Sequence, residues 1–493
     1  MERSGNRVVP YRHIRIILSN LTGLFAVTAI LMGAMTVICF LLGEAYASPG
    51  FAVSFVVSGV AAVVLKIVFP SPEELELRHA MLVAALAYLA VPAISTIPFV
   101  MIEHMSVIDA FFESISGWSC TGLTMIVYPE YCTHVIQLFR SLTQWIGGIG
   151  VILLMVTILI RPGTSTYIMY QSETRKEKIK PSIRSTINMI WFLYLVITLL
   201  GVALLVVVGM PLWDSINHSM VSIGTGGFSV WSDSIAHYQS FNIELACMVI
   251  MIIGALPIVF IYKSIKTPKS LFNLDSEVKA YFFIILLGVT LLTAEYYIEH
   301  GNLFESLRIS AFQFVSGLTT TGLQTTDMST GWSHTALLIL SIAAIIGGCA
   351  GSTSGGLKVS RVVFLIKEFE LWLKRTLLPR NAIVTLKIGN KRLAEDVVRK
   401  ELSEAALISF LYLVVILVSV MLLSHFVAST YDLSTIIFSV CSAQGNVGLQ
   451  TPIINPALHY IGKIILIVDM WVGRLEIIPV TLLIRYMIKG FKV

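Results

Sequence analysis

Ser316-Gly-Leu-Thr-Thr-Thr-Gly-Leu-Gln324 decides the fold of this 493-residue chain, because the same pattern occurs four times. In each copy, small polar residues lead into a glycine that is followed by Leu or Phe. The other copies are Ser116-Gly-Trp-Ser-Cys-Thr-Gly-Leu-Thr124, Ser222-Ile-Gly-Thr-Gly-Gly-Phe-Ser229 and Ser442-Ala-Gln-Gly-Asn-Val-Gly-Leu-Gln450. Four copies of one short pattern predict a chain built from structural repeats.

A second glycine supports this interpretation. Aligning the four copies brings Gly122, Gly227, Gly322 and Gly448 into register. A further glycine follows 25 residues later in three copies and 27 residues later in the second copy. These later glycines are Gly147, Gly254, Gly347 and Gly473. Two glycines at nearly constant spacing indicate that each repeat extends well beyond the short pattern.

The composition is typical of a membrane protein. Hydrophobic residues make up 56% of the chain and charged residues 13%, about half the share of charged residues in a soluble domain. The apolar runs reach the roughly 20 residues that a membrane-spanning helix needs. First helices of the repeats are expected near 79–102, 186–209, 278–298 and 402–427, and second helices near 135–160, 243–264, 335–365 and 457–488. Two further helices, near 15–43 and 51–69, bring the expected total to about ten spans.

The expected fold is therefore an all-α membrane protein with four tandem helix–pore loop–helix repeats around one pore. A segment too short to span, such as 109–117, precedes each aligned glycine and is expected to be re-entrant. The expected domains are an N-terminal helix pair at 1–75, repeats at 76–165, 180–268, 274–370 and 401–493, and a cytoplasmic loop at 371–400.

The distribution of basic residues predicts the orientation. Lys and Arg cluster in the N-terminus and in segments 161–184, 263–269, 361–400 and 485–492, whereas 102–134 and 211–244 contain none. The positive-inside rule then places both termini and the basic loops in the cytoplasm. Because these loops are short and flanked by membrane segments, we expect the lipid bilayer and no nucleic acid as partner.

Re-entrant glycine loops favour a cation pore. Non-helical backbone at membrane depth is tolerated only where protein or a water-filled cavity surrounds it. Glycine permits positive φ, so carbonyl oxygens can face a common axis and replace the hydration shell of a monovalent cation. For any single segment, a Gly/Ser/Thr-rich turn between helices is the alternative interpretation.

Acidic residues outnumber basic ones in the expected outer segments, where Arg308 is nearly the only base. The acids are Glu103, Asp109, Glu113, Glu130, Asp214, Asp233, Glu299, Glu305, Asp327 and Asp432. They predict an acidic vestibule that concentrates cations, although ordinary solvated loops would have the same composition.

An enzyme is not expected. The chain contains no P-loop, HExxH or nucleophile-elbow motif in a suitable context, and His218 has no evident partner. The six cysteines lack metal-ligand spacing, although Cys120 and Cys132 lie in one expected outer loop and could pair. A secondary transporter that couples potassium or another solute to a proton or sodium gradient is the alternative function.

These segments resemble the Trk/Ktr/HKT superfamily of potassium transporters, and most closely its TrkH type. The resemblance covers essentially the whole chain and includes Arg140-Ser-Leu-Thr-Gln-Trp-Ile-Gly-Gly-Ile-Gly150, Gly347-Gly-Cys-Ala-Gly-Ser-Thr-Ser-Gly-Gly-Leu-Lys358 and Gly473-Arg-Leu-Glu476. It implies potassium uptake across the cytoplasmic (inner) membrane, with K⁺ as the permeant ion and no organic cofactor. It also implies a homodimer and a cytosolic, nucleotide-binding regulatory subunit of the TrkA type.

The resemblance further implies which residues form the site. The potassium-binding filter would comprise Cys120, Thr121, Gly122, Thr225, Gly226, Gly227, Thr320, Thr321, Gly322, Asn446, Val447 and Gly448. Family members with serine in place of the first filter glycine tend to conduct sodium, so the four glycines here favour potassium.

The resemblance also implies a gate below the filter. It would comprise Gly347, Gly348, Gly351, Ser352, Thr353, Ser354, Gly355, Gly356 and Arg474. Because glycine disfavours helix by ~1 kcal/mol per residue, the run of glycines predicts a broken helix there, with close helix packing as the alternative. Arg474 would be an electrostatic barrier to cations, or instead a structural ion-pair partner of Asp469 or Glu476.

Overall fold

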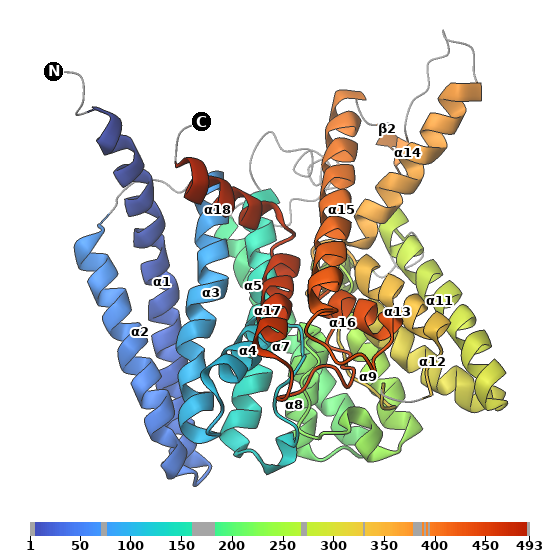
Figure 1. The fold of residues 1–493 in the computed structure, drawn as a ribbon, viewed down its shortest axis with the longest axis horizontal. Coiled ribbons are helices and arrows are strands. Elements are labelled where there is room, and N and C mark those ends of the chain that lie inside the picture. The colour runs from blue at the N-terminus through green and yellow to red at the C-terminus, as the bar shows by residue number, and fades with distance from the viewer. Residues whose placement is uncertain are drawn as a thin grey trace.

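The computed structural model describes residues 5–70, 76–159, 183–267, 274–328, 331–377, 387–388, 391–392 and 395–490. Most of the basic segment expected at 161–184, the domain boundaries expected at 75, 165, 180 and 268, and much of the loop expected at 371–400 lie outside the described residues. The described elements are helices (Figure 1), apart from one antiparallel pair of two-residue strands, β1 (Lys387–Ile388) and β2 (Lys391–Arg392).

One succession of elements occurs four times. It begins with a long helix: α3 (Leu77–Ile102), α7 (Ile183–Val207), α11 (Ser276–His300) or α15 (Glu395–Leu423). A short helix follows: α4 (Val107–Trp118), α8 (Leu212–Gly224), α12 (Leu303–Leu318) or α16 (Leu433–Gln444). After a loop comes another helix: α5 (His134–Leu159), α9 (Phe241–Gly254), α13 (His334–Ile346) or α17 (Tyr460–Arg474). Three short 3₁₀ helices, η1 (Ala45–Ala47), η2 (Pro129–Tyr131) and η3 (Ser234–Tyr238), lie in connections.

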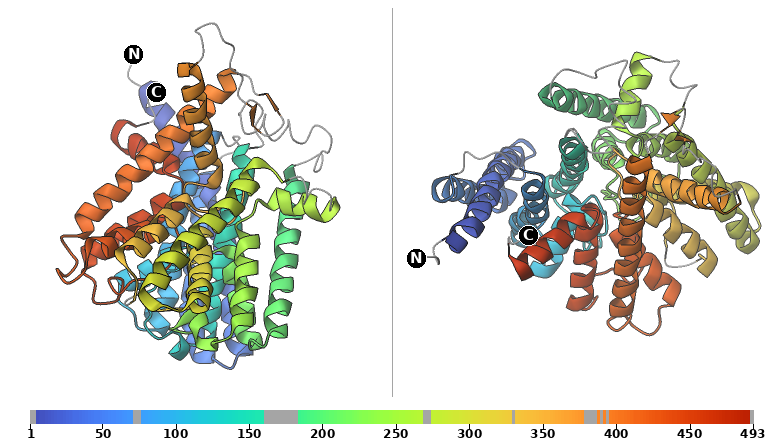
Figure 2. Two further views of the ribbon diagram at one scale, coloured as in Figure 1. Left: turned by 90° about the vertical axis from the view of Figure 1, so that its right-hand side faces the viewer. Right: turned by 90° about the horizontal axis from the view of Figure 1, so that it is seen from above.

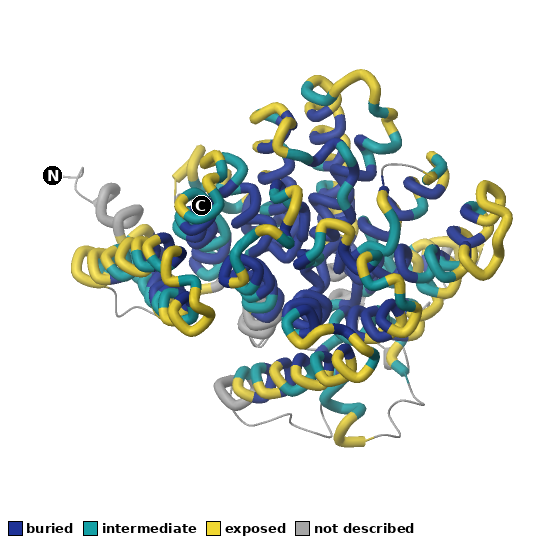
Figure 3. The backbone as a smooth tube through the Cα atoms, turned by 90° about the horizontal axis from the view of Figure 1, so that it is seen from below, coloured by how far each residue is buried: buried dark blue, intermediate teal, exposed yellow. Residues whose placement is uncertain are grey.

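The short helices lie in the interior and the long helices surround them. Phe112, Phe312 and Phe438, one from each of three short helices, are 0% exposed, and Figure 3 shows buried backbone at the centre with exposed segments around it. Six helices in the described part of the chain are long and apolar enough to cross a membrane, and the bent pair α9 and α10 (Ile258–Lys266) could form a seventh. Exposed apolar side chains on these outer helices suit a lipid environment.

Three of the helices that follow the glycine loops are broken. α9 and α10 meet at a bend of 101°. α13 is separated from α14 (Val359–Leu377), and α17 from α18 (Ile478–Lys489). The sequence predicted only the break between α13 and α14, so the single helices expected near 243–264 and 457–488 were wrong, because each is divided into two helices. Pro257 lacks the amide hydrogen that would continue α9, and Glu476 and Ile477 adopt positive φ after α17.

The N-terminal pair α1 (Gly5–Leu41) and α2 (Ser48–Val68) lies at one edge of the bundle (Figures 1 and 2). Glu44, between these helices, accepts hydrogen bonds from the backbone amides of His134 (2.9 Å) and Val135 (3.0 Å). A carboxylate at the first amides of α5 satisfies donors that no helical carbonyl can reach and complements the helix dipole. This contact fastens the pair to the first of the four units.

Gly288 allows α11 to pack closely against α12. A Cβ at Gly288 would overlap the ring of Phe314, which is only 4% exposed and has little room to move. We predict that Gly288→Ala lowers the thermal unfolding midpoint of the detergent-solubilised protein, because overpacking costs about 1–3 kcal/mol. The matched control is Gly59→Ala in α2, where no atom lies within 4 Å of the added methyl. Equal midpoints for the two variants would contradict this packing.

Candidate functional site

The same turn follows each of the four short helices. The amide of the residue before each aligned glycine donates to a carbonyl five residues earlier: Thr121 to Ser116 (2.9 Å), Gly226 to Val221 (2.9 Å), Thr321 to Ser316 (2.9 Å) and Val447 to Ser442 (2.8 Å). Positive φ occurs two residues before each glycine, at Cys120 (54°), Thr225 (49°), Thr320 (56°) and Asn446 (53°). The aligned glycines themselves have φ between 82° and 92°, a region that residues with a side chain rarely adopt.

The four aligned glycines form a closed ring. A Cβ on each would collide with the carbonyl oxygen that precedes the next glycine: Gly122 with Gly226, Gly227 with Thr321, Gly322 with Val447, and Gly448 with Thr121. Glycine is therefore required at these positions both by the backbone conformation and by the neighbouring loop. We call Gly122, Gly227, Gly322 and Gly448 the glycine ring.

Carbonyl oxygens of the ring are available to a ligand. No donor from the described residues bonds to the carbonyls of Thr121, Thr321 or Val447, whereas that of Gly226 accepts from the Gln144 side chain (2.6 Å). Buried carbonyls without partners are rare because leaving a hydrogen bond unmade is costly. A desolvated cation could supply the missing partner.

The structure explains why a second glycine recurs about 25 residues after each ring glycine. A Cβ at Gly147, Gly254 or Gly473 would lie against the last carbonyls of the short helix in its own unit, at Trp118, Ile223 and Gln444 respectively. Gly347 in the third unit differs, because it packs against Gly355 and Gly356 of the broken segment. Each of the three helices can therefore approach the end of its short helix closely.

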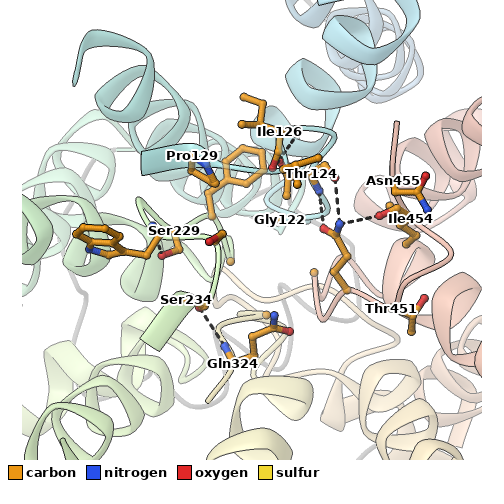
Figure 4. A pocket seen from close by; sticks show the side chains of 18 of the residues that line it. Gly122, Thr124, Ile126, Pro129, Ser229, Ser234, Gln324, Thr451, Ile454 and Asn455 are labelled. Carbon is orange, nitrogen blue, oxygen red and sulfur yellow. Dashed lines mark hydrogen bonds between the residues drawn. The ribbon is translucent and has the colours of Figure 1, made fainter. Parts of the chain in front are cut away.

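A pocket of about 340 Å³ opens on one side of the glycine ring, and all four ring glycines line it. Figure 4 shows Thr124, Ser234, Gln324 and Thr451, from four different loops, around this pocket. Gln450 bridges two loops, because its side chain accepts from the amide of Thr124 (3.0 Å) and donates to the Thr124 carbonyl (3.2 Å). The lining contains one base, Arg140, and one acid, Asp327, and its other polar residues are uncharged.

Several acids expected to face an open vestibule instead pair with bases. Glu113 is 0% exposed and binds Arg140 (2.8 Å). Asp109 binds the buried Lys463 (2.5 Å). Neither Glu113 nor Asp109 lines the pocket, whose one acidic residue is Asp327. The expectation of a broadly acidic vestibule was therefore wrong for these two residues, because they neutralise basic groups inside the fold.

Arg140 joins the first and second loops, a role that the sequence did not reveal. Its guanidinium donates to Glu113, to the Ser229 carbonyl (2.9 Å) and to the Thr124 hydroxyl (3.1 Å), and it lies 4.1 Å from the centre of the Phe228 ring. One turn later, Gln144 contacts Phe228 and Gly226 in the second loop. The available signal was an Arg and a Gln four residues apart in an apolar helix, which indicates one polar face.

The segment between α13 and α14, residues 347–358, lies against the other side of the ring; we call it the connecting loop. Its Thr353 hydroxyl donates to the carbonyls of Ile223 (2.8 Å) and Gly254 (2.9 Å). The amide of Gly355 donates to the Thr320 hydroxyl (2.7 Å). The connecting loop contributes no residue to the pocket, and it contacts the second and third glycine loops at Thr225 and Thr320, which precede the ring glycines.

Arg474 points to the connecting loop and pairs with neither of the two acids considered from the sequence. It is 3% exposed and donates to the carbonyls of Thr353 (2.9 Å) and Gly147 (3.1 Å). Asp469 instead accepts from the Ser419 hydroxyl (2.6 Å), and Glu476 forms an ion pair with Arg361. A purely structural ion pair therefore does not explain Arg474.

Other candidate groups have structural partners. Cys120 and Cys132 are both free thiols, and Cys120 donates to the Gln144 carbonyl (3.0 Å), so the two do not pair. His218 contacts the Asp214 carbonyl (2.9 Å) and the Ser229 hydroxyl (3.0 Å), partners that the sequence did not reveal. Among the described residues, no three His, Cys, Asp or Glu side chains are placed to hold a metal ion.

Comparison with known proteins identifies the family. The pattern of the TrkH family, described as cation transport protein, matches residues 47–490. An uncharacterised cation transporter of Methanocaldococcus jannaschii is 34% identical over 84% of this chain and 83% of its own length. The Trk system potassium uptake protein TrkH of Salmonella typhimurium is 31% identical over 83% of this chain and 86% of its own.

Structural similarity extends over nearly the whole chain. The crystal structure of the potassium transporter TrkH from Vibrio parahaemolyticus has a TM-score of 0.82 and 28% sequence identity, over 95% of this chain and 98% of that chain. Together with the family match over residues 47–490, this shows that the chain belongs to the TrkH family of cation transport proteins, which are multi-pass membrane transporters and not enzymes.

Proposed function

We propose that this protein takes up potassium across the cytoplasmic membrane through a channel-like pore whose filter is the glycine ring and its carbonyls. One observation carries the proposal: the four glycines close a ring, and three adjoining carbonyls have no donor among the described residues. A ring of carbonyls can replace the hydration shell of potassium. The names of the Salmonella and Vibrio relatives as potassium transporters support this choice of ion.

The filter residues would act mainly through their backbones. Cys120 and Thr225 direct their side chains to nearby carbonyls of Gln144 and Gly224. The Asn446 side chain bonds to Thr121 and to the carbonyl of Met470, both at 2.9 Å. These contacts hold the loops in position while the backbone carbonyls remain free to bind the ion. The short helices end at the ring, and their partly negative C-terminal ends would stabilise a cation there.

The connecting loop and Arg474 would form the gate. The loop contacts the filter loops at Thr225 and Thr320 and also contacts Arg474, and its glycines allow conformations that a regular helix excludes. The Arg474 charge would oppose a cation that leaves the filter. We further propose that the protein forms a homodimer and works with a cytosolic nucleotide-binding subunit. Both termini of the chain would lie in the cytoplasm.

The filter predicts a sharp effect of Gly322→Ser. A Cβ there would collide with the Val447 carbonyl and Gly448, and the φ of 82° disfavours any side chain. We expect rubidium uptake into proteoliposomes to fall by at least about tenfold, the factor that corresponds to 1.4 kcal/mol, with a larger relative share of sodium flux. A potassium-uptake-deficient host should no longer grow at low potassium when it carries this variant.

The matched control is Gly317→Ser in the preceding short helix. The nearest atoms would lie 3.6 Å from a Cβ added at Gly317, which is an ordinary contact distance. It should retain rubidium flux and growth. Wild-type protein that passes no rubidium, even with a regulatory subunit present, would refute the pore. Rubidium uptake that requires an imposed proton or sodium gradient would favour the secondary-transporter alternative.

The gate predicts greater flux from Arg474→Ala. This variant removes the charge and the hydrogen bonds to the Thr353 and Gly147 carbonyls. Because hydrogen bonds to charged groups contribute about 1.5–3 kcal/mol, we expect basal rubidium flux to rise on the order of tenfold. Arg474→Lys keeps the charge and should stay closer to wild type. Unchanged flux in Arg474→Ala, at equal amounts of folded protein, would contradict the barrier role.

A further inference from the structure

We propose that the Arg361–Glu476 ion pair is a latch that holds the connecting loop in its closed position. This inference rests on the proposed function, in which the connecting loop gates the pore. The pair joins the two broken helices that approach the gate from different units: Arg361 lies in the first turn of α14, directly after the connecting loop, and Glu476 lies between α17 and α18.

The ion pair is placed to control the loop without belonging to the ion path. The Arg361 guanidinium binds Glu476 and also donates to the carbonyl of Leu357, the penultimate residue of the loop (2.9 Å). Glu476 follows Arg474 by two residues, and Arg474 holds the Thr353 carbonyl in the middle of the loop. Arg361 in α14 therefore holds the end of the connecting loop, and Arg474 in α17 holds its middle.

The backbone around the pair is strained. Glu476 (φ 54°), Ile477 (φ 69°) and Lys358 (φ 79°) all adopt positive φ without being glycine. A β-branched residue such as Ile477 is a genuine outlier in this region. Such strain persists only where surrounding contacts enforce it, and it is concentrated at switches and binding sites. Opening of the Arg361–Glu476 pair would let this junction relax, which provides a second conformation for a gate.

The local charges make Glu476 the more important partner. Lys358 lies close enough to interact electrostatically with two other cations, Arg361 and Arg474, and with two acids, Glu476 and Glu277. Lys358 is 4% exposed and bonds to the Ser354 carbonyl inside the loop. Loss of the Glu476 charge would leave three neighbouring cations with less compensation, and their repulsion would push the loop and α14 away from α17.

The Arg361–Glu476 pair is also partly accessible from the surface of the helix bundle. The side chains of Arg361 and Glu476 are 19% and 11% exposed, so the protein does not fully enclose the pair. Figure 1 shows α14 projecting with the start of α15 beyond the other helices, at the end of the molecule where α1 begins and α18 ends. A force applied to the projecting part of α14 would act on Arg361 at its other end.

The test measures basal rubidium flux in proteoliposomes of the full-length chain without a regulatory subunit. We expect Glu476→Gln and Arg361→Gln each to raise flux about two- to fivefold, the range for loss of a partly exposed ion pair, with the larger rise in Glu476→Gln. The exchanged pair, Arg361→Glu with Glu476→Arg, should return flux toward the wild-type value because the attraction is restored.

The matched control is the Lys374–Glu370 pair (2.6 Å), which lies in the same helix α14 and joins no other element. Its double variant Lys374→Gln/Glu370→Gln should leave flux unchanged. Thermal unfolding midpoints, measured for all variants, separate a latch from a merely structural pair, which would lower the midpoint without raising flux.

Three outcomes would overturn the latch. Both single variants could show wild-type flux, the single variants could change flux in opposite directions, or the exchanged pair could fail to restore the wild-type flux although the protein folds. Opposite directions would indicate that the pair acts only through the electric field at the pore exit. Failure of the proposed function is distinguishable, because then the wild-type protein itself would pass no rubidium.

Discussion

The close approach of four glycines to four carbonyls is the constraint on which the rest of the structure depends. Each ring glycine lies against the carbonyl that precedes the next one, and no side chain fits between them. The loops can meet in this way only if each short helix ends at the same distance from the common axis. The second set of glycines meets this requirement in three units, because it lets Gly147, Gly254 and Gly473 lie against the ends of their short helices.

Such a ring needs polar contacts between units, and these occur at all four junctions. Arg140 binds the Ser229 carbonyl between the first and second units, and Arg308 binds Glu244 between the third and second. His334 contacts Ser434 between the third and fourth (2.7 Å), and Lys463 binds Asp109 between the fourth and first. Arg140 and Lys463 are buried, and in a bilayer no water compensates buried polar groups, so internal pairing is the remaining way to satisfy these two.

The units share one plan but differ in the helices that follow the glycine loops. α5 runs without interruption in the first unit, whereas its counterparts are broken in the other three. The third unit contributes the connecting loop and the fourth contributes Arg474, which contacts both that loop and the Gly147 carbonyl of the first unit. The departures from symmetry therefore converge on one side of the glycine ring, opposite the pocket. The glycine ring itself keeps the same backbone turn in all four units.

The sequence by itself determined the properties that depend on local chain order. The glycine spacing predicted the recurring loops, the apolar runs predicted the outer helices, and the glycines of residues 347–356 predicted a broken helix. Only the tertiary structure decided which groups compensate the buried charges, because their partners come from remote segments: Arg474 contacts Gly147, 327 positions away in the chain, instead of the nearby Asp469 or Glu476. The break after Arg474 and the pairing of Glu113 with Arg140 were likewise decided by packing, whereas the bend at Pro257 has a local cause in the proline itself. Hydrophobic periodicity reports how apolar a segment is, but it does not report where a neighbouring carbonyl or charge will lie.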